Sequence, residues 1–155
     1  MVRAIRDNND STAGVVHFTP RSATIMLPLV RRIVADMIEL NEAIESQREQ
    51  IKGIDRLPET IERADYQEEL RDVRASLSDD EKRLQLCLGE LAALGLEPHI
   101  PIDGSVDFPA ILNRRQVRLC WHPDDEQVDH WHEPGQTPES RTKIEPHAFG
   151  QESLN

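Results

Sequence analysis

The chain is poor in several features on which common protein classes depend. It has only two cysteines, Cys87 and Cys120, which are too few for a disulfide framework, so we expect reduced thiols. Its 7 glycines are scattered and form no phosphate-binding loop. No apolar run approaches the roughly 18 residues of a membrane span. The first ten residues also lack the apolar core of a signal peptide. These absences predict a soluble, cytoplasmic protein.

Basic residues are also in short supply. The sequence has 18 Lys and Arg against 29 Asp and Glu, which gives a formal net charge of -11. Nucleic acids and anionic membranes both attract basic surfaces. We therefore expect neither of them as a partner.

A first long helix is predicted from about residue 20. Thr19-Pro20 is typical of an N-cap followed by proline in the first turn. Apolar residues then recur at alternating spacings of four and three, and Gln47 is the one polar residue in this series. The apolar residues are Met26, Val30, Ile33, Met37, Leu40, Ile44 and Ile51. Pro28 should kink this helix or delay its regular start.

A second helix is predicted to begin near Glu59 and to end at Gly95, which suits a left-handed C-cap. Its apolar positions follow the same spacing, and they are Leu70, Val73, Leu77, Leu84, Cys87, Leu91 and Leu94. Asp80 is the one acidic position among them. Ser78 to Glu81 resembles a capping box, so the helix is expected to break or restart at Ser78.

The chain changes character after Pro98. Short β-prone runs, at Val106–Phe108, Gln116–Trp121 and Val128–His132, alternate with turn residues. The predicted fold is α+β: a long antiparallel two-helix hairpin, coiled-coil-like, with a small antiparallel sheet in the C-terminal third. We expect one domain over residues 15–145, with the hairpin at about 20–95 and the sheet region at about 98–145. Residues 1–14 and 146–155 are expected to be flexible tails.

Five short motifs carry a family resemblance. In order, they are Phe18-Thr19, Leu27-Pro28, Gly104-x-Val106-Asp107-Phe108-Pro109, Leu119-Cys120-Trp121 and Trp131-His132-Glu133. Together they resemble the bacterial and archaeal domain-of-unknown-function family 2203, over roughly residues 15–145. In one further segment of the family pattern, Arg141 is the only residue that this sequence retains. The resemblance implies a fold and a site, and it implies no reaction.

The predicted hairpin between the last two strands suggests a metal site. We assume that Val117, Leu119, Trp121 and Trp131 share one face of the hairpin. Residues that lie opposite each other on the two strands then have numbers that sum to 250. The other face then carries four possible ligands of a divalent metal such as zinc, namely Cys120, His122, His130 and His132. Cys120 would lie across from His130, with their Cβ atoms about 5 Å apart. The simpler interpretation, which we favour, is a polar face on which Cys120 packs as a small hydrophobic residue.

Asp107 is a second candidate. An acid between two apolar residues could serve as a general base or a ligand, although we favour a cap of the following turn. The resemblance adds weight to Asp107 and His132. The candidate ligand-binding residues are Asp107, Trp121, Trp131, His132 and Arg141. No catalytic residue is identified, because no glycine-rich turn or helix start presents Cys120 as a nucleophile.

Two functions of different class follow. The first, which we favour, is a noncatalytic oligomeric interaction or scaffold module without a cofactor. The second is a metal-binding enzyme or sensor that uses the Cys/His face of the hairpin. Apolar residues outside the narrow helix seams, namely Leu27, Leu29, Val34, Ile38 and Leu88, must be covered by the sheet or by a second chain. We expect a homodimer through the helices.

Overall fold

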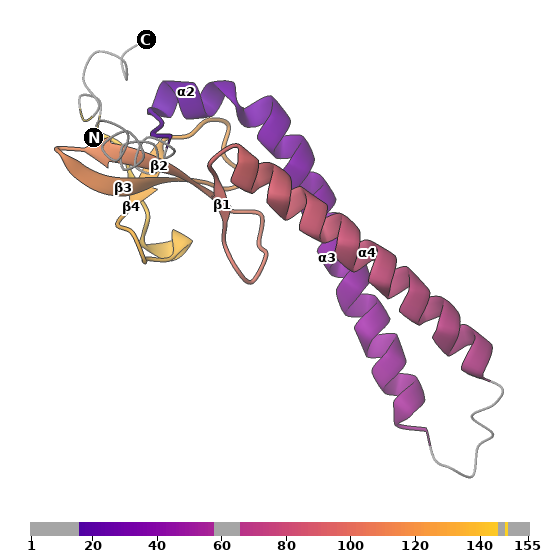
Figure 1. Ribbon diagram of the computed structural model, residues 1–155. Helices are drawn as coiled ribbons and strands as arrows, with labels where there is room; N and C mark the ends of the chain where they lie inside the picture. The colour runs from indigo at the N-terminus through magenta and orange to yellow at the C-terminus, as the bar shows by residue number, and fades with distance from the viewer. Residues whose placement is uncertain (1–15, 58–65, 146–147, 149–155) are drawn as a thin grey trace, which may run out of the picture.

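The computed structural model describes residues 16–57, 66–145 and 148, and over these the chain is an α+β protein (Figure 1). Its helices are α2 (Pro20–Ile25), α3 (Leu27–Asp55), α4 (Gln67–Ala93) and the 3-10 helix η2 (Pro138–Ser140). Its strands are β1 (Glu97–Pro98), β2 (Val106–Leu112), β3 (Arg115–Trp121), β4 (His130–His132) and β5 (Thr142–Lys143). The predicted fold class is confirmed. The predicted tails, residues 1–14 and 146–155, lie outside the described residues except for residue 148.

The first helix begins at the predicted cap. The Thr19 hydroxyl accepts a hydrogen bond from the Ser22 amide at 3.1 Å, and the Ser22 hydroxyl accepts one from the Thr19 amide at 2.9 Å. This reciprocal pair satisfies two of the free donors at a helix start. The helix then breaks at Met26, and Pro28 lies in the first turn of α3. Proline has no amide hydrogen to donate, so the regular helix starts late, as predicted.

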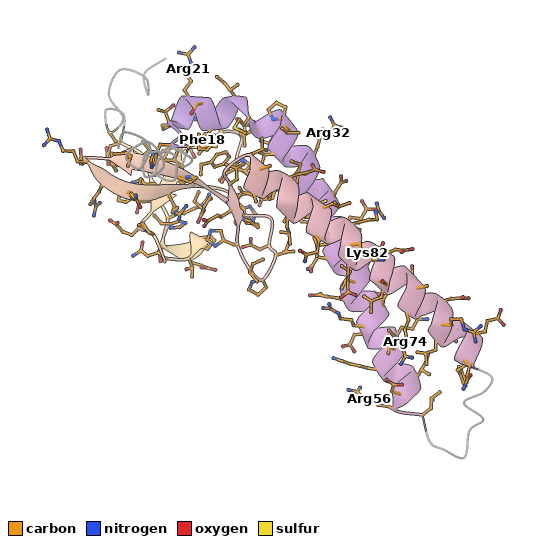
Figure 2. The ribbon with its side chains drawn as sticks, in the orientation of Figure 1. Phe18, Arg21, Arg32, Arg56, Arg74 and Lys82 are labelled. Atoms are coloured by element: carbon orange, nitrogen blue, oxygen red, sulfur yellow. The ribbon has the colours of Figure 1, made fainter. Side chains whose placement is uncertain are left out.

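The helices α3 and α4 run antiparallel and form an arm that extends past the sheet (Figure 1). Seven residues of α3 are buried, five from the predicted seam and two from outside it, and they are Leu27, Val30, Ile33, Val34, Met37, Leu40 and Ile44. On α4 the predicted seam residues are half-buried, except Leu91, which is fully buried. Charged residues of α4 such as Arg74 and Lys82, both labelled in Figure 2, are exposed to solvent. No helix among the described residues is long and apolar enough to cross a membrane.

One sequence-based prediction about α4 is wrong. The helix runs without a break from Gln67 to Ala93, so it neither stops nor restarts at Ser78. The reason is that Asp80, the acidic position in the seam, has a partner on the facing helix: Gln47 Nε2 donates to Asp80 Oδ2 at 2.9 Å. The one polar residue in the α3 seam therefore contacts the one acidic residue in the α4 seam. Leu77 and Leu84 can then pack on either side within one continuous helix.

The five strands form an antiparallel sheet in the order β1-β2-β3-β4-β5. One face packs against α2 and the start of α3. It carries buried residues from β2 and β3, namely Val106, Phe108, Ala110, Val117, Leu119 and Trp121, and Trp131 of β4 is half-buried beside them. Phe18 lies between the helices and the sheet (Figure 2), with its ring edge against Phe108 at 5.3 Å between centroids.

The sheet covers most of the apolar residues that lie outside the helix seams. Leu27 and Val34 are only 3% and 2% exposed, and Ile38 and Leu88 pack against the core, whereas Leu29 stays 45% exposed. One chain thus covers four of the five residues that motivated the prediction of a homodimer. The homodimer itself stays a prediction.

Candidate metal centre

Four side chains that can ligate metals converge on the sheet face opposite the helices. Asp107 on β2 lies directly across from Cys120 on β3. His132 comes from the next strand, β4, and His99 follows β1. One potential ligand atom from each of the four lies within 4.8 Å of all the others.

The alternation of strand residues explains this convergence. Phe108, Leu119 and Trp131 are paired across β2, β3 and β4 and face the core. Since successive side chains point to opposite faces, Asp107, Cys120 and His132 must point the other way. Three neighbouring strands therefore deliver one polar side chain each to a single spot.

Three of the four side chains in the cluster are shielded from solvent. Asp107 is 6% exposed, His132 is 2% and Cys120 is 0%. The yellow segment after β4 lies on the side of the sheet away from α2 (Figure 1). An arginine of this segment, Arg141, donates to the Cys120 carbonyl oxygen at 3.4 Å and forms a two-pronged pair with Asp125. The site is buried between the sheet and the C-terminal segment.

A single carboxylate oxygen lies at the centre of the cluster. Asp107 Oδ1 is 2.8 Å from His99 Nε2 and 3.0 Å from His132 Nε2. The two imidazole rings meet edge to face, with 5.6 Å between their centroids. Asp107 therefore bridges two histidines, and its side chain does not have the turn-capping role that we favoured from the sequence.

The bonding of His132 fixes where its proton lies. Its Nδ1 is 2.8 Å from the Glu133 carbonyl oxygen, which can only accept, so Nδ1 carries a hydrogen and donates. In the neutral ring, Nε2 then presents a lone pair to Asp107 Oδ1. Two such acceptors 3.0 Å apart repel each other unless a proton, held by the ring or by the carboxyl, or a metal ion lies between them.

The Cys120 thiol is held in its neutral form. Burial is the main cause, and the negative charge of Asp107 adds to it; together they raise the pKa of Cys120 from 9.0 to about 12, although Arg141 opposes them. A thiol that ionises so late is a poor nucleophile at neutral pH. A metal ion would have to replace the thiol proton in order to bind sulfur.

A second cluster locks the turn after β3. Trp121 Nε1 donates to the Asp125 carbonyl oxygen at 3.1 Å, and Arg31 of α3 donates to the same oxygen at 2.7 Å. The Arg31 guanidinium also lies over the Trp121 ring, 5.1 Å from its centroid. Burial raises the pKa of the Asp125 carboxyl, but hydrogen bonds from Arg141 and the His122 amide outweigh burial and lower it. This network joins the helices, the turn and the covering segment.

The structure separates the residues predicted for the site into two groups. Asp107, Cys120 and His132 come together, and the predicted register is confirmed by the pairs Arg118↔His132 and Leu119↔Trp131, whose numbers both sum to 250. The other predicted residues belong to other contacts. His130 Nδ1 lies 2.7 Å from Asp129, and His122 Nδ1 lies 3.5 Å from Asp124.

The two tryptophans and Arg141 also lie outside the cluster. Trp121 is 1% exposed, and Trp131 is half-buried on the core face, with Arg115 over its ring at 5.9 Å. Arg141 is paired with Asp125. The two tryptophans therefore make packing contacts, and Arg141 joins the C-terminal segment to the turn after β3.

His99 is the member of the cluster that sequence reasoning missed. It lies in a segment without a period, and the two-residue strand β1 that precedes it was not predicted. The available signal was the turn at Asp103-Gly104. That turn returns the chain so that the His99 amide donates to the Ser105 carbonyl oxygen at 3.0 Å.

Comparisons with known proteins add a family and no activity. A family model described as "Uncharacterized conserved protein (DUF2203)" matches residues 17–144, a range that contains all four residues of the cluster. No curated protein and no solved structure matches the chain.

Proposed function

The chain belongs to the DUF2203 family of uncharacterized conserved proteins, and from that premise we propose that it binds one divalent transition-metal ion. The ligands are His99, Asp107, Cys120 and His132. The observation that carries the proposal is the pairing of His132 with Asp107. Because Glu133 holds the proton of His132 on Nδ1, Nε2 is free to ligate, and it already points at the carboxylate. Metal-binding histidines commonly donate their other ring nitrogen to a carbonyl oxygen in this way.

Charge balance supports a divalent ion. A bound ion would meet the Asp107 carboxylate and the Cys120 thiolate, whose two negative charges cancel its two positive ones. The histidines would be neutral. A buried group of zero net charge avoids the large cost of an unpaired buried charge.

The donor set favours zinc and similar ions. It has two imidazole nitrogens, one thiolate sulfur and one carboxylate oxygen, whereas calcium and magnesium prefer oxygen ligands. Four protein ligands are typical of structural zinc sites, since catalytic sites keep a position for water or substrate. We therefore propose a noncatalytic role, in which the ion fastens β2, β3 and β4 to the loop after β1.

A zinc titration of chelator-treated protein tests this proposal. Free zinc at 100 times the dissociation constant would stabilise the fold by about 2.7 kcal/mol. For a chain of this size that corresponds to roughly 5–11 °C in melting temperature, at about 2–4 °C per kcal/mol. Asp107→Asn keeps the side-chain shape but removes the charge that balances the ion, so this variant should lose most of the zinc response.

His130→Ala is the matched control, because it removes an imidazole from the same strand but from outside the cluster. This variant should respond to zinc as the wild type does. The proposal is wrong if zinc, cobalt and nickel all leave the wild-type melting temperature unchanged. It is equally wrong if His130→Ala loses as much of the response as Asp107→Asn.

The helical arm supports a second candidate, an interaction or scaffold module that assembles through its helices. The observation in its favour is the large apolar side chains that stay exposed on the two long helices, Leu29 at 45% and Leu86 at 68%. A partner that covers them would bind the helices, whereas the proposed metal cluster lies on the sheet face opposite the helices. The two proposed functions are therefore compatible in one chain.

A further inference from the structure

The four ligands of the cluster are not held alike. Asp107, Cys120 and His132 stand on three hydrogen-bonded strands, whereas His99 stands on the loop between β1 and β2. The exposed fraction of the side chain is 18% for His99, 9% for Asp107 and 1% for His132. Among these ligands, solvent reaches the His99 side chain most.

The backbone around His99 is fixed although its ring reaches solvent. The His99 amide donates to the Ser105 carbonyl oxygen at 3.0 Å. At the other end of the loop, Gly104 packs so closely against Pro123 that an added Cβ would lie 2.7 Å from the Pro123 ring. Next to His99, the Ile100 side chain is 72% exposed. A rotation of the His99 side chain therefore requires no movement of the sheet.

We infer that His99 is an exchangeable ligand, whose departure opens one coordination position to a small external nitrogen donor while the three strand ligands keep the ion. This inference rests on the proposed metal site and extends it. With His99 turned away, the carboxylate, the thiolate and a divalent ion still sum to zero charge. A neutral donor such as imidazole preserves that balance, whereas an anion would leave a net negative charge in a buried site. The ligand class is therefore a neutral, monodentate nitrogen base.

The probe for this inference is the cobalt(II)-loaded protein, because cobalt reports its ligands through visible absorption. Thiolate ligation by Cys120 gives a sulfur-to-cobalt charge-transfer band, and the visible bands respond to a change in the other ligands. We compare wild type with His99→Ala and His99→Gly, both of which remove the imidazole and leave space. Circular dichroism confirms that each variant is folded.

Both variants should keep the charge-transfer band, because the strand ligands remain. Added imidazole should then shift their visible bands in a saturable way, and it should shift the wild-type bands only at higher concentration, because there it must displace His99. A wild-type spectrum that never responds would show that His99 does not exchange. Release of cobalt to a competing chelator should be about 10–100-fold faster in the variants, a range comparable to the loss that follows disturbance of ligand-supporting residues. Saturating imidazole should restore slow release.

Two further results would overturn the inference and leave the metal site intact. One is a wild type that binds cobalt while both folded His99 variants bind none, which would make His99 indispensable. The other is an imidazole titration with the same midpoint in wild type and variants, which would place the imidazole elsewhere. If the wild type itself fails to bind cobalt, this inference falls, and the metal site falls with it when zinc and nickel also leave the melting temperature unchanged.

Discussion

Gly104 offers the sharpest test of how the loop that carries His99 is held against the sheet. Its φ is +93°, a conformation in which a residue with a Cβ is strained by about 1–2 kcal/mol. An added Cβ would also lie 2.7 Å from Pro123 Cγ and 3.0 Å from Ile38 Cδ1. Overpacking of this kind costs a further ~1–3 kcal/mol. Gly104→Ala should therefore destabilise the protein by about 2–5 kcal/mol, which is large against the ~5–15 kcal/mol of a typical domain.

Thermal denaturation followed by circular dichroism measures this effect. At about 2–4 °C per kcal/mol, the melting temperature should fall by roughly 4–20 °C. The matched control is Gly89→Ala within α4, where an added Cβ meets nothing within 4 Å. Alanine is favoured over glycine inside a helix, so this control should stabilise the protein by about 0.5–1 kcal/mol. If the two variants melt alike, the loop is not packed against Pro123 and Ile38 as described.

Two further predictions concern pH and assembly. The thiol of Cys120 has its pKa raised from 9.0 to about 12 in the metal-free fold, so its contribution to stability is complete below pH 9 and is lost as the pH rises towards 12. Urea unfolding of wild type should show this loss, and Cys120→Ala should show less of it; equal losses in both would contradict the assignment. A homodimer through the helices should scatter light as 35.4 kDa, twice the 17.7 kDa of one chain. Leu29→Lys and Leu86→Lys, on exposed positions, should reduce that mass, and a wild-type mass of one chain would rule the dimer out.

The parts of the fold that depend on a repeating pattern could be predicted from the sequence. The spacing of apolar residues located both helix seams, and Gly95 ends α4 with a φ of +83°, as a left-handed cap requires. Alternation along β3 placed Cys120 on the face away from the core. These features are set by local geometry, so one sequence is enough to find them.

The parts that depend on contacts between distant segments could not be predicted. Asp80 looked like a defect because its partner, Gln47, lies 33 positions earlier in the chain. The site was found only in part for the same reason. Strand pairing places Asp107 across from Cys120, and the return of the chain at Ser105 brings in His99. The turn at Asp103-Gly104 could be read from the sequence, but the residues that it brings together could not. His130 alternates correctly and still turns to its neighbour Asp129.

The order of the sheet has a consequence for how the chain folds. Each strand pairs with the strand before or after it in sequence, so every hairpin closes a short loop and loses little chain entropy. Folds built from such neighbouring contacts form quickly, because few distant segments must find each other first. Hydrogen bonds also join the two layers. The Phe18 amide donates to the Pro109 carbonyl oxygen, and the Val128 amide donates to the Thr24 hydroxyl. Because residues of both layers form one apolar core, docking of the helices on the sheet completes the native state.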